Sequence, residues 1–282
     1  MTNQIMTTLS LPANTKGRDF VVGDLRGAFD LLEHALSAVF FNPDTDRLFS
    51  VGNVVGKESD SANCIDFLNK PYVHAVLGDN EASLINLYNQ IGTDTPNYLL
   101  RGEQLYKKGL NWWLEISAEL KQAIISSLKT LPVLIETETL SGLKVGVIHG
   151  EVPLGMDWQT FRTQIEADDQ QILVTVMLGG DRVKANNRTP VAGIDRIFAG
   201  HSIVFPEDEE GLPIYGNVIM TDTGAAVTLK PQSGGLSIID MDSLNSIMIE
   251  THKYSKARKT GDPARLDIPD VFKILEDDSL LN

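Results

Sequence analysis

Five predicted strands of this sequence each end at a glycine beside a polar side chain. In chain order the pairs are Gly23-Asp24, Gly52-Asn53, Gly78-Asp79, His149-Gly150 and Gly200-His201. Ligands of open α/β sheets collect at the carboxyl ends of the strands, where glycine permits sharp turns and a close approach of the backbone. The recurrence therefore predicts an α/β fold whose polar strand ends meet at one site.

Strand and helix patterns alternate from Asp19 onward, as in a sheet covered by helices. Helical periods are found at 29–40, 61–69 and 118–128. Short apolar runs predict strands at 20–22, 48–51, 73–77, 133–136, 144–148, 196–199, 218–221 and 237–241. We expect one domain at 19–250 with a mostly helical cap at about 83–131, between an N-terminal extension at 1–18 and a C-terminal extension at 251–282.

Charge and hydropathy limit the classes of partner. The 282 residues carry a formal net charge of −14, and nucleic acid requires a basic face, so we expect no nucleic-acid partner. The acidic charge either serves solubility or marks a cationic protein partner. No apolar run approaches the roughly 20 residues that span a bilayer, and the polar N-terminus is not typical of a signal peptide. We therefore expect a soluble, cytoplasmic protein with no membrane contact.

Some residues with reactive or aromatic side chains are assigned to packing. The single cysteine, Cys64, excludes an internal disulfide and lies in an amphipathic stretch without a neighbouring histidine, so we interpret it as a core residue. Trp112 and Trp113 are assigned to burial rather than to a ligand site. A basic patch at 253–259 and an amphipathic stretch at 268–281 predict a tail that lies on the domain or a partner, or is solvated.

Each polar strand end has an ordinary structural explanation when it is taken alone. Asp24 or Asp79 can cap a helix, Asn53 can form an Asx turn, and His149 or His201 can be a hydrogen-bonded core histidine. Together the residues favour a metal site, because carboxylate and amide oxygens and imidazole nitrogens are all ligands for divalent Mn, Zn or Fe.

Six short motifs follow one another along the chain: VVGDLRG, SVGNVVGK, VLGDNE, VIHG, AGHS and TDTGA. Their order and spacing resemble the motifs of the bacteriophage-type serine/threonine phosphatases of the phosphoprotein phosphatase superfamily, over about residues 19–243. The resemblance implies the calcineurin-like metallophosphoesterase fold, a layered α/β/β/α sandwich with a mostly helical cap insertion. For an active member it also implies a metal-dependent hydrolase of phosphoric esters.

The resemblance implies two metal sites, which this sequence matches unequally. The first metal of the family is held by residues that match Asp24, Arg26 and Asn53. Arginine replaces a histidine there, has no lone pair and is permanently protonated, so we expect it to pair with Asp24 in a vestigial first site.

The second metal of the family is held by residues that match Asn53, Asp79, His149 and His201, with the aspartate and asparagine exchanged. This set still offers one carboxylate, one amide oxygen and two imidazoles. The expected cofactor is therefore none or one divalent metal ion.

The positions that match the family's acid and phosphate ligands also differ. Asn80 stands at the position of the leaving-group acid, and its amide cannot deliver a proton near neutral pH. Lys57 replaces a phosphate-binding arginine, and Arg182 lies near the position of another. Lysine keeps the charge but loses the bidentate geometry of arginine.

Three functional hypotheses follow from these changes. The first is a pseudophosphatase that binds a protein partner of unknown identity without turnover. The alternative is a phosphoesterase that uses one metal at the second site, with Lys57 and Arg182 orienting the phosphate. The third is a binding module in which one metal has only a structural role. Metal analysis combined with a phosphatase assay distinguishes them.

Overall fold

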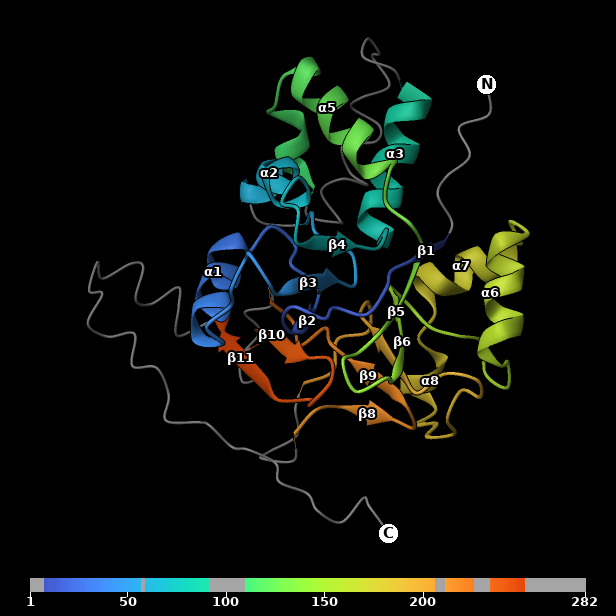
Figure 1. Cartoon of the computed structure of the whole chain (residues 1–282). Coiled ribbons are helices and arrows are strands. Elements are labelled where there is room, and N and C mark those ends of the chain that lie inside the picture. The colour runs from blue at the N-terminus through green and yellow to red at the C-terminus, as the bar shows by residue number, and fades with distance from the viewer. Residues whose placement is uncertain (1–7, 57–58, 92–109, 206–210, 226–233, 252–282) are drawn as a thin grey trace.

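The computed structural model describes residues 8–56, 59–91, 110–205, 211–225 and 234–251. The strands form two sheets, which lie between two groups of helices (Figure 1). The larger sheet has the strand order β1-β5-β6-β7-β9-β8, and the smaller has the order β11-β10-β2-β3-β4. This architecture confirms the predicted layered α/β sandwich.

The smaller sheet contains the first three predicted strands of the domain. β2 (Asp19–Val22), β3 (Arg47–Ser50) and β4 (Val73–Ala75) are parallel neighbours, so their carboxyl ends lie at the same edge. The connections contain α1, η1 and α2, and two antiparallel strands complete the sheet. Their bounds are α1 (Phe29–Ala38), η1 (Ser59–Asn63), α2 (Cys64–Leu68), β10 (Gly235–Asp240) and β11 (Ser246–Glu250).

The larger sheet contains three parallel neighbours, β6 (Lys144–Ile148), β7 (Arg196–Ala199) and β9 (Val218–Met220). β5 (Leu134–Glu138) pairs antiparallel with β6, and β8 (Ile214–Tyr215) pairs antiparallel with β9. β1 (Thr8–Ser10) lies within the predicted N-terminal extension and pairs with β5 in parallel.

Helices α6 (Trp158–Glu166), α7 (Gln170–Leu178) and α8 (Asp181–Lys184) follow β6 along the chain. No helices were predicted in this part of the chain, although the sequence contains two aspartates at N-cap positions. Asp157 accepts a hydrogen bond from the backbone of Thr160, and Asp169 accepts from the backbone of Ile172. Aspartate at an N-cap satisfies backbone N–H groups that have no partner within the helix.

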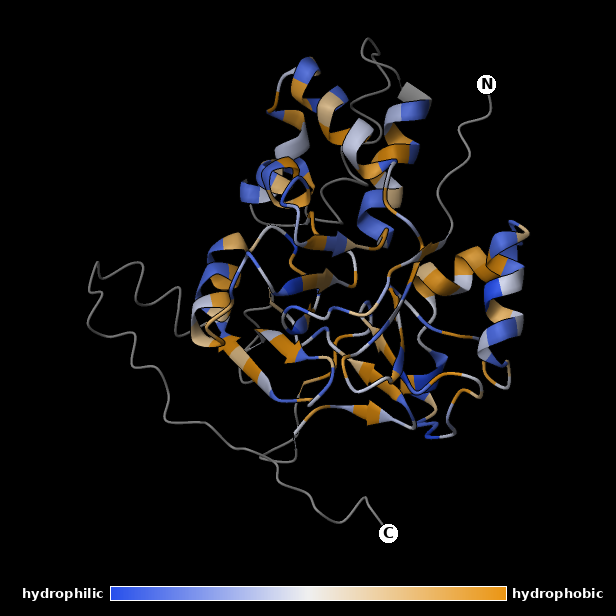
Figure 2. Cartoon of the chain, viewed as in Figure 1, coloured by the Kyte–Doolittle hydropathy of each residue, from blue (hydrophilic) through white to orange (hydrophobic). Residues whose placement is uncertain are grey.

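Three apolar clusters hold the layers together. Between the sheets, Val21 and Phe49 of the smaller sheet pack with Phe198 and Ile219 of the larger one. A second cluster joins α6 and α7 to the larger sheet. These strands are apolar on both faces because each sheet is covered on both sides. Figure 2 shows the same pattern, with apolar strands and helices of mixed hydropathy.

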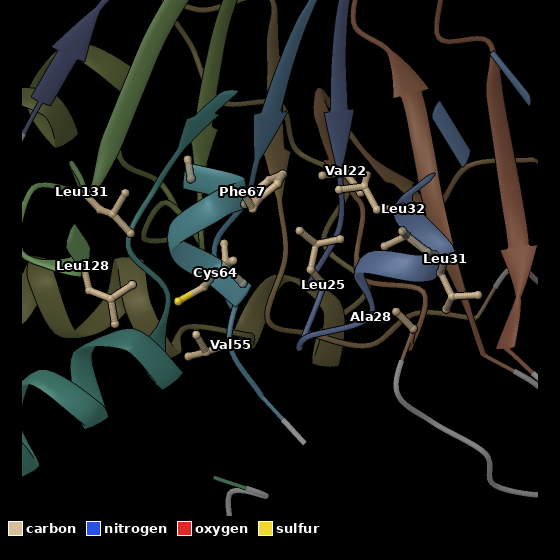
Figure 3. Packing of buried hydrophobic residues seen from close by; sticks show 14 of the residues in the cluster. Val22, Leu25, Ala28, Leu31, Leu32, Val55, Cys64, Phe67, Leu128 and Leu131 are labelled. Atoms are coloured by element: carbon tan, nitrogen blue, oxygen red, sulfur yellow. The ribbon is translucent and has the colours of Figure 1, made fainter. Parts of the chain in front are cut away.

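The third cluster joins the smaller sheet to its helices and includes Cys64, Phe67 and Leu128 (Figure 3). Burial raises the pKa of the fully buried Cys64 thiol to about 12, so it remains a protonated packing residue. Trp112 and Trp113 are 5% and 3% exposed in the same cluster. The prediction that these residues serve packing is confirmed.

The regular elements in the described part of the predicted cap region are helices. It contains α3 (Asp79–Ile91), η2 (Asn111–Leu114) and α5 (Ala118–Leu128), while residues 92–109 lie outside the described residues. The predicted tail, including the basic patch at 253–259, also lies outside them. Within the described part of the chain, no helix combines the length and apolar content of a membrane-spanning segment.

Candidate metal and phosphate site

The fold brings all five polar strand ends to one place. Asp24 follows β2, Asn53 follows β3, and Asp79 opens α3 after β4. His149 and His201 follow β6 and β7 of the other sheet. The five residues are linked by hydrogen bonds or short polar contacts, as the glycine-polar pattern predicted.

Asp79, His149 and His201 form a set of metal-ligand atoms, here called the metal triad. Asp79 Oδ1 lies 3.2 Å from His149 Nε2 and 3.5 Å from His201 Nδ1. The three ligand atoms all lie within 4.8 Å of one another. Donors about 2.0–2.1 Å from a tetrahedral zinc ion are about 3.3 Å apart, and both distances from Asp79 Oδ1 are close to this value.

His149 is oriented by the backbone of the neighbouring sheet. Its Nδ1 lies 2.7 Å from the carbonyl oxygen of Val51, which can only accept, so Nδ1 carries a proton and Nε2 faces the triad. Histidine ligands of metals are oriented in this way when the ring nitrogen away from the metal donates to a backbone carbonyl. Burial alone lowers the pKa of His149, but the hydrogen bond to Asp79 and the charges of Asp24 and Asp79 raise it to about 9. The pocket therefore favours a positive charge, whether from a proton or a metal.

Asn53 is placed differently from the ligand role predicted for it. Its amide oxygen accepts a hydrogen bond from the backbone N–H of Asn80 at 2.9 Å. Its amide nitrogen donates to Asp24 Oδ2 and to Asp79 Oδ1, each at 2.9 Å. The backbone N–H of Asn80 can only donate, so the atom that faces it is the amide oxygen of Asn53. The amide nitrogen therefore faces Asp79 of the triad. Three of the four predicted ligands therefore converge, and Asn53 bridges Asp24 and Asp79 as a hydrogen-bond donor.

Arg26 and its carboxylate partners lie beside this bridge. Nη2 of Arg26 lies 3.0 Å from Asp24 Oδ2, which confirms the expected pair, and 2.7 Å from Asp222 Oδ2. Both aspartate side chains are fully buried. Burial opposes the charge of Arg26, but Asp222 and Asp24 outweigh it and raise the pKa of the guanidinium. Burial and the nearby Asp24 raise the pKa of Asp222, while Arg26 opposes this shift.

Asp222 was not assigned a role from the sequence. It lies in the TDTGA motif, two residues after β9, so it is a further polar residue at a strand end. The motif was recognised, but its separation of 196 residues from Arg26 hid the contact. Its position after β9 was the signal that could have identified it, because Asp222 is a polar residue beyond a strand end like the other five.

A buried carboxylate holds the loop that carries Asn53. Glu81 accepts hydrogen bonds from the backbone N–H groups of Asn53, Val55 and Gly78, each at 2.9 Å. The side-chain amide of Asn80 donates to the carbonyl of Val55 at 2.9 Å. Asn80, at the family's acid position, therefore serves the loop in this structure. These bonds join the ends of β3 and β4 and limit the freedom of the site.

The phosphate-binding role of Arg182 and Lys57 stays a prediction. Arg182 is 3% exposed, and its Nη1 donates to the carbonyls of Thr189 and Asn187 at 2.7 and 3.4 Å. Its backbone N–H bonds to Glu151. The guanidinium is therefore hydrogen-bonded to the 187–189 turn, which supplies acceptors for a buried donor. Lys57 lies outside the described residues.

Comparisons with known proteins agree with the motifs and the fold. Serine/threonine-protein phosphatase 2 of Salmonella typhimurium is 27% identical over 212 residues, which are 73% of this chain and 87% of that protein. Serine/threonine-protein phosphatase 2 of Escherichia coli is 27% identical over 224 residues, 77% of this chain and 90% of that protein. The chain is a relative of the phosphoprotein phosphatase superfamily. No protein-family model matches it.

A solved structure shows that the likeness also holds for the fold. A protein with the provisional name diadenosine tetraphosphatase superimposes with a TM-score of 0.57 at 20% identity. The match covers 87% of this chain and 98% of that chain. At this identity the match establishes a shared metallophosphoesterase fold.

Proposed function

We propose that this protein hydrolyses a phosphate ester with one divalent metal ion held by the metal triad. The observation that carries the proposal is the convergence of three ligand atoms within 4.8 Å. The fixed Nδ1 bond of His149 supports it, because it presents Nε2 to the same point. The likeness to phosphatases of two bacteria supports the reaction class.

In this reaction a water oxygen adds to phosphorus and the bond between phosphorus and the leaving oxygen breaks. A phosphate monoester then yields inorganic phosphate and an alcohol, whereas cleavage of the anhydride chain of diadenosine tetraphosphate yields two nucleotides. A divalent ion held by Asp79, His149 and His201 would supply a Lewis acid for the phosphoryl oxygen and would lower the pKa of a water molecule. The residues of the chain hold and orient the ligands: Val51 fixes the His149 ring, and Asn53 fixes the Asp79 carboxylate. Such preorganisation reduces the reorganisation that the reaction requires.

The experiment measures metal content and hydrolysis in the same preparations. Full-length protein purified without chelators is analysed for bound metal and assayed on p-nitrophenyl phosphate, a phosphopeptide and diadenosine tetraphosphate with manganese. We expect about one metal per chain, and a loss of about 100-fold or more in rate for His201→Ala. His34→Ala, on α1, is the matched control and retains activity. Absence of bound metal, with no rise in melting temperature on adding manganese, contradicts the proposal.

A non-catalytic protein that binds a protein partner is the second candidate. The observations that favour it are the Arg26–Asp24 ion pair, the neutral Asn53 between two carboxylates and the Asn80 amide bonded to the loop. The named relatives favour the phosphoesterase instead. One bound metal without hydrolysis of any of the three substrates supports this second candidate, with the ion in a structural role.

A further inference from the structure

Arg26 is a cation in contact with two buried carboxyl groups from distant parts of the chain. A single nitrogen, Nη2, contacts both Asp24 and Asp222, at 3.0 and 2.7 Å. Each carboxylate side chain has 0% exposure. Two carboxylates that share a buried site repel each other and lose hydration, so they require a cation. Arginine supplies that charge permanently.

The backbone around Arg26 fixes the position of this charge. Arg26 has a φ of 50°, in the left-handed region that non-glycine residues rarely occupy. Its N–H donates to the carbonyl of Asn53 at 2.7 Å, and the next N–H, of Gly27, donates to Val54 at 2.9 Å. A side chain at Gly56 would collide with the Cβ of Arg26, so only glycine leaves room there. The strained turn and the tight packing are consistent with a defined place for the guanidinium.

The carboxylates around Arg26 are connected to the metal triad through one side-chain amide. Asn53 Nδ2 lies 2.9 Å from both Asp24 Oδ2 and Asp79 Oδ1. Asp24 Oδ1 also accepts the backbone N–H of His201 at 3.2 Å. A second cation beside a metal site is the arrangement of two-metal phosphoesterases, whose ions lie about 3.5–4 Å apart. Here the guanidinium takes the place beside Asp24.

We infer that Arg26 is a built-in second cation, which excludes a second metal from Asp24 and Asp222 and limits the site to one ion. The inference rests on the proposed function for the identity of the first ion. It concerns the number of metals and not the reaction. A shorter neutral side chain at position 26 leaves both carboxylates without their cation, and a divalent metal can then take its place.

The test compares two buried arginine–aspartate pairs at opposite ends of the same strands. Arg26 lies beyond the carboxyl end of β2, whereas Arg47 pairs with Asp19 at its amino end, with Nη2–Oδ2 at 2.6 Å. Full-length wild type, Arg26→Ala, Arg26→His and Arg47→Ala are titrated with Mn²⁺. Native mass spectrometry gives the metal count, and thermal unfolding gives the metal-dependent rise in melting temperature.

We expect each Arg26 variant to gain one Mn²⁺ relative to wild type and to be stabilised more strongly by the metal. Arg47→Ala loses stability without gaining a metal, because its carboxylate partner is not part of a ligand cluster. Equal metal counts in wild type and both Arg26 variants overturn the inference. If the Arg26 variants fail to fold, the wild type decides: saturation at one Mn²⁺ agrees with the inference, and binding of two overturns it.

The two proposals fail in different ways. A wild type that binds no Mn²⁺ contradicts the proposed function. A gain of one Mn²⁺ in the Arg26 variants still supports the inference in that case, and no gain contradicts it. Arg26→Lys serves as a further comparison, since it keeps a positive charge and is expected to keep the metal count of the wild type.

Discussion

Two halves of the site balance their negative charge in different ways. In the arginine half, Asp24 and Asp222 share the guanidinium of Arg26, so the compensating cation is part of the chain. In the metal half, Asp79 faces the imidazoles of His149 and His201, and the raised pKa of His149 indicates that this pocket favours a positive charge. One half therefore has a permanent cation, whereas the other half takes its positive charge from a proton or a metal.

The largest expected effect is the loss of the permanent cation. With a chelator present, Arg26→Ala should lower the free energy of unfolding by about 3 kcal/mol, because two buried carboxylates lose their partner. Arg18→Ala is the control, since Arg18 is 45% exposed in its pair with Asp46 and such pairs contribute about 0–1 kcal/mol. Urea denaturation measures both. Equal losses in the two variants would show that the arginine half has no special electrostatic role.

The second prediction removes the carboxylate of the metal half. Asp79→Asn should weaken Mn²⁺ binding by about 100-fold or more, because a neutral amide replaces the charged ligand and loses its attraction for the ion. Calorimetric titration of full-length protein measures the affinity. Asp44→Asn, at an exposed aspartate, is the matched control and should leave it unchanged. An unaltered affinity in Asp79→Asn would place the metal elsewhere.

The third prediction concerns pH. The pKa of His149 is raised to about 9, so at neutral pH the imidazole is protonated in the metal-free protein and a metal must displace that proton. Metal affinity should therefore rise about tenfold per pH unit up to about pH 9, and fall as the pH is lowered. Calorimetry at several pH values below 9 measures the slope. A flat profile would mean that His149 does not exchange a proton for the metal.

The smallest expected effect is the loss of a hydrogen bond to Gly56, in the loop that packs against Arg26. Trp112 Nε1 donates to the carbonyl of Gly56 at 2.8 Å in a buried position. Trp112→Phe leaves this acceptor without the indole donor, so we expect about 1 kcal/mol more destabilisation than in Trp113→Phe, which matches it in size. Metal affinity should stay the same in both. A change in metal affinity would show that the two halves are coupled through the loop.

Much of the scaffold and of the metal half was predictable from local sequence features. The strand at 144–148 and the strand at 196–199 were predicted with the bounds that the structure shows. Asp79, His149 and His201 were identified because each stands beside a glycine at a strand end, which is a pattern within a few residues. The helices α6 and α7 were missed, although Asp157 and Asp169 are N-cap residues at their starts.

The finer arrangement of the site was not predictable in the same way. The orientation of Asn53 depends on the backbone N–H of Asn80, 27 residues away, which takes its amide oxygen. The contacts of Arg182 depend on a turn that brings Thr189 to its guanidinium. Residue type alone states which groups can donate or accept, but it does not state which partner comes within reach.

By itself, the sequence determined the layered α/β scaffold, the strand ends at which polar side chains gather and the replacement of a histidine by Arg26. Apolar periodicity and glycine positions are local, and they specify the strands, the helices and the polar strand ends directly. The layered sandwich and the replaced histidine follow from the resemblance of the six motifs to the bacteriophage-type phosphatases. Only the tertiary structure decided that Asp222 shares Arg26 with Asp24 and that Asn53 donates to Asp24 and Asp79. These contacts join residues from different strands, and their geometry arises only when the sheets pack and each buried donor must find an acceptor.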